Sequence, residues 1–228
     1  MGRKDTRRQL ILAAERLFAE RGIEGVSLRE INLAAGQRNT SAAHYHFGSK
    51  EALVDAIFEF RRPAIGTRRD EWFGKVERDG RLEDPRALTE AFIMPLAQEM
   101  RGGDDGASHY LMFLAHLFLQ SPDQVRDILR KHQAGEERWS VLLTQALPEI
   151  PPELLFTRIY LLGRHVVISL AVYQRRGLGL DDVGFDIYLS NLIDSSTGYL
   201  TVAPSERTMA QVENRRRARR SSEAPSAN

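Results

Sequence analysis

The first sixty residues repeat apolar side chains at α-helical spacing, and glycine and serine interrupt that spacing at short intervals. In the first segment the apolar residues fall at i, i+4, i+7 and i+8, the pattern of a helix with one buried face. They are Leu10, Ala14, Leu17 and Phe18. Gly22 follows, as is common after a helix C-terminus. The pattern predicts a helix over residues 6–21.

A second and a third helix are predicted directly afterwards. Ser27 precedes the segment LREINLAAG and Glu30 follows three residues later, which is the capping-box pattern of a helix N-terminus. After the turn QRN, residues 40–47 predict a helix of about eight residues that ends at Gly48. Ser49 is the predicted N-cap of a fourth helix. Short helices joined by a tight turn form a helix-turn-helix module.

The rest of the chain also predicts helices and contains no convincing strand or internal repeat. Pro63 is expected to kink or end the fourth helix. Further helices are expected over residues 85–100, 108–120, 122–147, 153–177 and 181–200. Residues 204–228 are polar and basic and include the segment RRRARR. We expect this tail to be disordered, because it cannot bury enough apolar surface to fold alone.

Charge is unevenly distributed along the 228 residues. Residues 1–50 carry nine Lys or Arg against five Asp or Glu, a balance of +4, whereas residues 51–203 have a balance of −6. A basic segment attached to an acidic body indicates that the N-terminal end meets a polyanion. The absence of cysteine excludes disulfides and zinc fingers and fits a reducing cytoplasm. The longest apolar run, residues 159–173, is interrupted by Arg164 and His165, so we expect a soluble cytoplasmic protein without a membrane segment.

The segment SAAHYHFGSK contains two histidines, but neither metal binding nor catalysis is expected there. His44 and His46 are two residues apart, so on a helix they point about 200° away from each other and cannot bind one ion. Ser41 and His44 lie close in sequence, but no acid in the segment orients the imidazole. We expect no catalytic residue, no metal and no cofactor, and the protein is not expected to be an enzyme.

A DNA-recognition helix explains the same segment better. Such a helix places its N-terminal end in the major groove, where short polar side chains reach base edges. Arg38 can pair with guanine and Asn39 with adenine, while Thr40 and Ser41 can bond a base or a phosphate. Phosphate contacts, which fix orientation without reading sequence, are expected from Ser27, Tyr45 and Lys50.

The segments ILAAERLFAERGIEGVSLREINLAAG and YHFGSKEALVDAIF resemble the N-terminal domain of the TetR family of bacterial transcription regulators. The resemblance covers residues 8–58 and implies an all-helical homodimer with a helix-turn-helix in each subunit. It also implies a variable C-terminal domain that binds a small molecule. By position, the resemblance makes Ser27, Tyr45 and Lys50 phosphate contacts and turns Thr40, Ser41 and His44 toward the bases.

The spacing of the recognition segment departs from the common family pattern. Eight residues separate Gly36 from Tyr45, where the commonest pattern has seven. Either Asn39 or Thr40 could therefore be the N-cap. This leaves open which of Arg38, Asn39 and Thr40 reads the bases.

The dimer interface is predicted from the last two long helices, because residues 154–173 are apolar on more than one face. Candidate interface residues are Arg164, His165, Ile168, Val172, Ile187 and Leu192. The alternative is that these helices form an intramolecular core. A buried arginine must be paired. Arg164 could therefore pair with Asp186, Asp194 or a partner carboxylate, or one of Arg164 and His165 could contact a polar group of a ligand.

A ligand pocket is predicted where Met and aromatic side chains recur in the middle helices, because flexible Met and rigid rings suit an adaptable apolar cavity. Its candidate residues are Phe92, Met94, Met112, Phe113, His116, Trp139 and Phe156. Ordinary core packing explains the same residues as an alternative. His116 could equally be a hydrogen-bonded core histidine.

Taken together, the sequence predicts an all-α protein. It has a helix-turn-helix DNA-binding domain (residues 1–50), a helical ligand-binding and dimerisation domain (51–203) and a disordered basic tail (204–228). The predicted function is a transcriptional repressor that binds a palindromic operator as a homodimer and is released by a small, largely apolar effector. The alternative is a constitutive regulator or activator of the same fold without an inducer.

Overall fold

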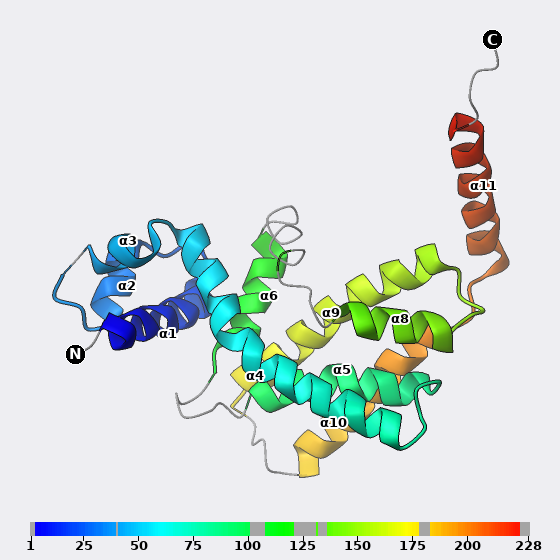
Figure 1. Cartoon of the computed structure of the whole chain (residues 1–228), viewed down its shortest axis with the longest axis horizontal. Coiled ribbons are helices and arrows are strands. Elements are labelled where there is room, and N and C mark those ends of the chain that lie inside the picture. Colours follow the sequence, from blue (N-terminus) through cyan, green and yellow to red (C-terminus); the bar gives the residue numbers. More distant parts are fainter. Residues whose placement is uncertain are drawn as a thin grey trace.

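The computed structural model describes residues 3–39, 41–100, 108–120, 131, 136–177 and 183–223. All secondary structure of these residues is helical, which confirms the all-α prediction (Figure 1). The helices are α1 (Arg3–Arg21), α2 (Leu28–Ala34), α3 (Ala42–Phe47), α4 (Lys50–Arg78), α5 (Pro85–Glu99), α6 (Tyr110–Gln120), α8 (Glu136–Ala146), α9 (Pro152–Arg175), α10 (Val183–Thr201) and α11 (Glu206–Glu223). Much of the helix predicted over residues 122–147 lies outside the described residues.

Helices α1, α2 and α3 pack together at one end of the molecule and form the predicted helix-turn-helix, here called the N-terminal lobe (Figure 1). The predicted capping box is present at α2. The Ser27 N–H donates to Glu30 Oε2 at 2.8 Å, and Ser27 Oγ accepts from the Glu30 N–H at 3.3 Å. Gly22 and Gly36 follow α1 and α2 with φ angles of 73° and 66°, a region that glycine enters without strain.

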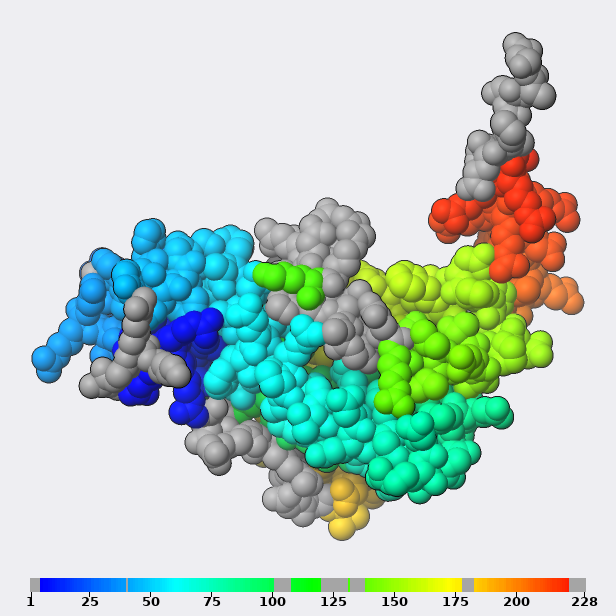
Figure 2. Space-filling view, viewed as in Figure 1, coloured from blue at the N-terminus to red at the C-terminus, as the bar shows by residue number. Residues whose placement is uncertain are grey.

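Helix α4 leads from the N-terminal lobe along the rest of the molecule (Figures 1 and 2). Ser49 caps its first turn, as predicted. The sequence suggested that Pro63 kinks or ends this helix, but α4 does not end there and continues to Arg78. Pro63 is exposed, while Phe58 and Ile65 on either side of it are buried. Packing of both halves of α4 against the same core therefore outweighs the lost backbone donor.

The C-terminal part of α4 forms a helical body with α5, α6, α8, α9 and α10 (Figure 1). Helix α5 packs against α4 and α10, and α6 lies between α1 and α9. Among the described residues, α9 is long and apolar enough to cross a membrane, judged by length and composition. In this structure, however, α9 packs against α6 and α10 and buries Leu162, Val166 and Leu170 in the core.

A buried ionic network joins the N-terminal lobe to the body. Arg61 of α4 donates to both carboxylate oxygens of Glu15 in α1, at 2.6 and 2.8 Å, and to Glu99 of α5 at 3.2 Å. Arg68 reaches the other oxygen of Glu99 at 3.0 Å, and Ser108 Oγ also donates to Glu99. Burial alone would lower the pKa of Arg61, but the hydrogen bond and charge of Glu15 outweigh burial and raise it.

The tail differs from the prediction. The sequence predicts disorder over residues 204–228, whereas Glu206–Glu223 form α11, which projects from the end of the molecule opposite the N-terminal lobe (Figures 1 and 2). The disorder prediction is wrong for these residues. Arg216 forms a bidentate pair with Glu153 of α9 at 2.8 and 2.7 Å, and Val212 is buried. Contacts with a distant part of the chain therefore anchor a segment that composition alone would leave unfolded.

Candidate nucleic-acid interface and ligand cavity

The turn before α3 is organised by Asn39. Its Oδ1 accepts a hydrogen bond from the Ser41 N–H at 2.9 Å, and Ser41 is the residue that directly precedes α3. The N-cap of α3 is therefore Ser41, and the prediction that it is Asn39 or Thr40 is wrong. The Asn39 side chain nevertheless accepts a hydrogen bond from a backbone N–H of the turn. Thr40 itself lies outside the described residues.

Asn32, which the sequence analysis did not identify, fixes the angle between α2 and α3. It is buried on the inner face of α2, and its Oδ1 accepts from the Ala43 N–H at 2.7 Å. One of the N–H groups at the start of α3 is thereby bonded to α2. The sequence does carry a signal for this role of Asn32, because Asn32 is a polar residue that directly follows the apolar Ile31 of the inner face of α2.

The structure places most predicted DNA contacts on an exposed surface. Ser27, Arg38, Asn39, Ser41, His44 and Tyr45 are all exposed. Lys50 is less accessible, because its Nζ donates to the Ile23 carbonyl oxygen at 3.1 Å and lies 3.4 Å from Glu24 Oε2. A phosphate contact by Lys50 would therefore replace or share these bonds.

Ser27 is also engaged before any DNA arrives. Its backbone N–H and its Oγ, both at 2.8 Å, donate to Glu30 Oε2, and Arg21 lies 2.8 Å from the other carboxylate oxygen. The bonds from Ser27, followed by that from Arg21, lower the pKa of Glu30 to about 2. The start of α2 is thus held in one geometry at neutral pH.

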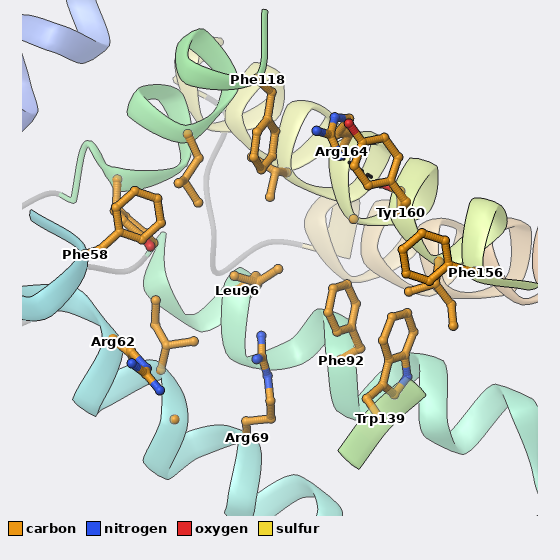
Figure 3. Close-up of a pocket in the computed structure, with 17 residues that line it drawn as sticks. Phe58, Arg62, Arg69, Phe92, Leu96, Phe118, Trp139, Phe156, Tyr160 and Arg164 are labelled. Atoms are coloured by element: carbon orange, nitrogen blue, oxygen red, sulfur yellow. Dashed lines mark hydrogen bonds between the residues drawn. The ribbon is translucent and has the colours of Figure 1, made fainter. Parts of the chain in front are cut away.

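The body contains a cavity of about 170 Å³ between α4, α5, α6, α8 and α9 (Figure 3). Of the predicted pocket residues, Phe92, Trp139 and Phe156 line it. The rings of Phe92 and Trp139 stack 4.0 Å apart, and Trp139 Nε1 donates to the Leu88 carbonyl oxygen at 3.0 Å. With its N–H satisfied, the indole presents an apolar face to the cavity.

The other predicted pocket residues lie elsewhere. Met112 and His116 border a second, more open hollow of about 500 Å³ between α1, α6 and α9. Phe113 is fully buried against Phe18 and Phe58, so it is a core residue. Met94 is partly buried against the core and does not border either space.

Arg62 and Arg69, which are not among the predicted pocket residues, line the first cavity from α4. Arg164, predicted at the dimer interface, also lines this cavity. The proposed pairing of Arg164 with Asp186 or Asp194 is wrong, because Asp194 pairs with Arg86 at 2.9 Å and Arg164 forms no ion pair within the described residues. The repeated pairs RR at 61–62 and 68–69 were the sequence signal for the arginines of α4.

The remaining interface candidates divide between surface and core. His165, Val172 and Ile187 are exposed on α9 and α10, and Ile168 is partly buried. Leu192 is buried within the chain, so it is not accessible to a partner in this structure.

Comparison with known proteins agrees with this geometry. The sequence matches the family "Bacterial regulatory proteins, tetR family" over residues 10–57 and "Tetracyclin repressor-like, C-terminal domain" over residues 90–183. It is 33% identical over 117 residues to the HTH-type transcriptional repressor KstR2 of Rhodococcus jostii (strain RHA1). That match spans 51% of this chain and about half, 53%, of the relative's length.

Solved structures show the same fold. The hemolysin II transcriptional regulator HlyIIR aligns with a TM-score of 0.56 at 18% identity, covering 88% of this chain and 99% of that one. FadR from Bacillus subtilis, solved in complex with stearoyl-CoA, aligns with a TM-score of 0.56 at 15% identity, covering 87% and 99%. The first matched segment ends within α4, the helix that connects lobe and cavity, and the second begins within α5. The chain belongs to the TetR family of transcriptional regulators.

Proposed function

We propose that this protein is a cytoplasmic, ligand-responsive transcriptional repressor that binds a palindromic DNA operator as a homodimer and is released by a small molecule. One observation carries the proposal. Helix α4 begins directly after α3, and the same helix forms a wall of the cavity with Phe58, Arg62 and Arg69. A ligand that displaces the cavity wall would therefore move α4, and α4 would move the N-terminal lobe with it.

DNA recognition is assigned to the exposed end of α3 and its preceding turn. Arg38, Asn39, Thr40, Ser41 and His44 would face bases, while Ser27, Tyr45 and Lys50 would bond phosphates. In a two-fold dimer the two recognition helices would enter successive major grooves about 34–36 Å apart. An operator of matching symmetry follows from this geometry.

Dimerisation is assigned to the outer face of α9 and α10. Leu161, Val172 and Ile187 are 46%, 38% and 65% exposed there, an apolar surface that a partner would cover. On the same face, Ser196 Oγ is buried and makes no hydrogen bond within the described residues. A two-fold interface, in which each helix pair meets its own copy, would cover this surface without leaving an open end.

We assign release of the protein from the operator to a shift in the populations of two conformations of the dimer. An effector that binds better to the conformation whose recognition helices do not match the operator would favour that conformation by its difference in affinity. The cavity lined by Phe92, Trp139 and Phe156 favours this scheme over a constitutive regulator of the same fold.

The test begins with genomic DNA fragments that the protein retains, from which the operator is identified. On that operator, Tyr45→Phe and Lys50→Ala should weaken binding to all sequences about equally, and Lys50→Ala should lower the slope of log affinity against log salt by about one. Arg16→Ala, on the lobe but outside the proposed contacts, is the control. A changed base preference in either phosphate variant would contradict the assignment.

A further inference from the structure

Helix α11 carries a dense cluster of positive charge. Five of the six residues from 215 to 220 are arginine, and the carboxylate that precedes them most closely is that of Glu213. Residues 51–203, in contrast, carry 17 Lys or Arg against 23 Asp or Glu, a balance of −6. The acidic body therefore separates two basic parts of the chain, the N-terminal lobe and α11.

One of the five arginines anchors α11 to the body. Arg216 pairs with Glu153 of α9 at 2.8 and 2.7 Å, and Val212, one turn earlier, is buried. The hydrogen bond from Arg216 lowers the pKa of Glu153 to about 2, so both partners are ionised at neutral pH. These contacts hold α11 at a defined place on the body.

The other four arginines are exposed to solvent where α11 projects from the body (Figure 2). They are Arg215, Arg217, Arg219 and Arg220. Because consecutive residues are about 100° apart on a helix, these side chains extend on both sides of the one that pairs with α9. Arg217 lies 3.9 Å from Glu213, but a contact of this length between exposed side chains leaves most of its charge available to a partner.

This surface offers charge and hydrogen-bond donors without an apolar anchor. Between residues 213 and 221, the only apolar side chain is that of Ala218. A helix that inserts into a membrane surface needs an apolar face, and a stable protein interface needs an apolar centre. A partner that is bound through its charge alone fits α11 better than either.

Duplex DNA is such a partner, because its backbone carries one negative charge per about 1.7 Å of helix axis. Residues 215–220 extend over about 7.5 Å at 1.5 Å per residue, a length along which a duplex presents about four phosphates. The planar guanidinium group of arginine can form two parallel hydrogen bonds with one phosphate. Four exposed arginines therefore match the phosphates in number and in chemistry.

The position of α11 separates it from the DNA that the lobe would read. Helix α11 projects from the end of the molecule opposite the N-terminal lobe (Figure 1). Helix α4, which leads from the lobe along the body, has 29 residues and is therefore about 43 Å long. A duplex that lies across the two lobes of the proposed dimer would not pass α11.

We infer that the exposed arginines of α11 bind the phosphate backbone of duplex DNA, on a segment other than the one read by the N-terminal lobe. Phosphate contacts carry no sequence information, so α11 accepts any sequence. The separation into two segments rests on the proposed function, in which the lobe holds the operator. A dimer has two such helices and would hold further DNA close to its operator.

The experiment asks whether protein that already holds one duplex captures another. Full-length protein is bound to a bead-linked genomic fragment that it retains, excess protein is washed away, and a short labelled duplex of random sequence is added. We expect the labelled duplex to be captured at low salt. Its affinity should fall about 100-fold between about 50 and 200 mM salt, as counterion release from four phosphates predicts.

A variant then assigns the capture to α11. Replacing Arg215, Arg217, Arg219 and Arg220 together by glutamine should lower capture at least 10-fold and leave retention on the bead-linked fragment unchanged. Glutamine has a helix propensity close to that of arginine, and the contacts with α9 are not altered, so α11 should stay folded and in place. Circular dichroism checks the helix content.

The matched control removes the same charge from the body. It replaces Arg78, Arg138, Arg175 and Arg176, which are all exposed, by glutamine. Both variants lose four positive charges, so they differ in the place of the loss and not in its size. The control should capture the labelled duplex as the parent does.

No capture by the parent, undiminished capture by the α11 variant, or an equal loss in the control would each overturn the inference. So would capture of anionic phospholipid vesicles in place of the duplex, which would indicate a membrane surface as the partner. A failure of the proposed function looks different, because protein truncated after Ala203 keeps the lobe but would then be retained by no genomic fragment. In that case, titration of the free random duplex with the full-length protein and the α11 variant still decides whether α11 binds DNA.

Discussion

Replacing Arg61 by methionine tests the junction between the N-terminal lobe and the body. Methionine keeps most of the apolar length of the side chain and removes its charge. In the structure, Glu99 would retain Arg68 at 3.0 Å and Ser108 at 3.2 Å. Glu15, which is 1% exposed, would retain the His109 N–H at 3.0 Å but lose its cation.

The magnitude follows from this asymmetry. Removing one partner of a buried ion pair costs about 3–5 kcal/mol, because the other charge stays buried without compensation. Whole domains are stable by about 5–15 kcal/mol, so this one change should remove a large part of the free energy of unfolding. Adding Glu15→Gln to Arg61→Met should recover part of the loss, since it removes the uncompensated charge.

The assay is urea unfolding followed by circular dichroism, with Arg62→Met as the matched control. Arg62 is the next residue on α4 and forms no ion pair in the described part of the chain, so its loss should cost less than about 1 kcal/mol. Equal losses for the two variants, or no recovery in the double variant, would refute the idea that the network stabilises the junction.

Two further predictions follow. Glu30→Gln should lower the free energy of unfolding at neutral pH, because the ionised Glu30 carboxylate stabilises the fold and its pKa is lowered from 4.5 to about 2. As pH falls from about 4.5 to about 2, the carboxylate becomes protonated and this stabilisation is lost. The difference in stability between Glu30→Gln and the parent should therefore shrink over that range. Unfolding curves across that range check this, and a constant difference would contradict it. Truncation after Ala203 removes α11, whose contacts with the body include an exposed ion pair, and should leave a dimer on sizing with light scattering. A monomer would show that α11 takes part in assembly.

Local rules predicted the N-terminal lobe well. The capping box at Ser27 and Glu30, the cap at Ser49 and the glycines after α1 and α2 depend on neighbours within a few residues, so they are legible in sequence. Pro63 shows the limit of such rules, because tertiary packing on both sides kept α4 helical through it.

The cavity could be predicted only in part. Aromatic residues at Phe92, Trp139 and Phe156 were found by composition, but composition could not separate them from Phe113, which packs inside the core. The direction of Arg164 depends on how α9 is rotated against α6, a long-range contact that one sequence does not reveal. The partner of Asp194 was hidden for the same reason, since Arg86 lies far away in sequence.

The Glu15 to Arg61 contact also limits how this protein can be recombined with its relatives. The lobe and the body look like exchangeable modules, yet Glu15 is encoded with one and its partners with the other. A chimera that takes a foreign DNA-reading lobe must bring a carboxylate at the equivalent place on its first helix. It must also keep the length of α4 before Arg61, because removing one residue there would rotate Arg61 by about 100° relative to Glu15. A fusion point within α4 is therefore acceptable when it preserves both the helical register and the buried residues of this helix, such as Leu53, Phe58 and Ile65.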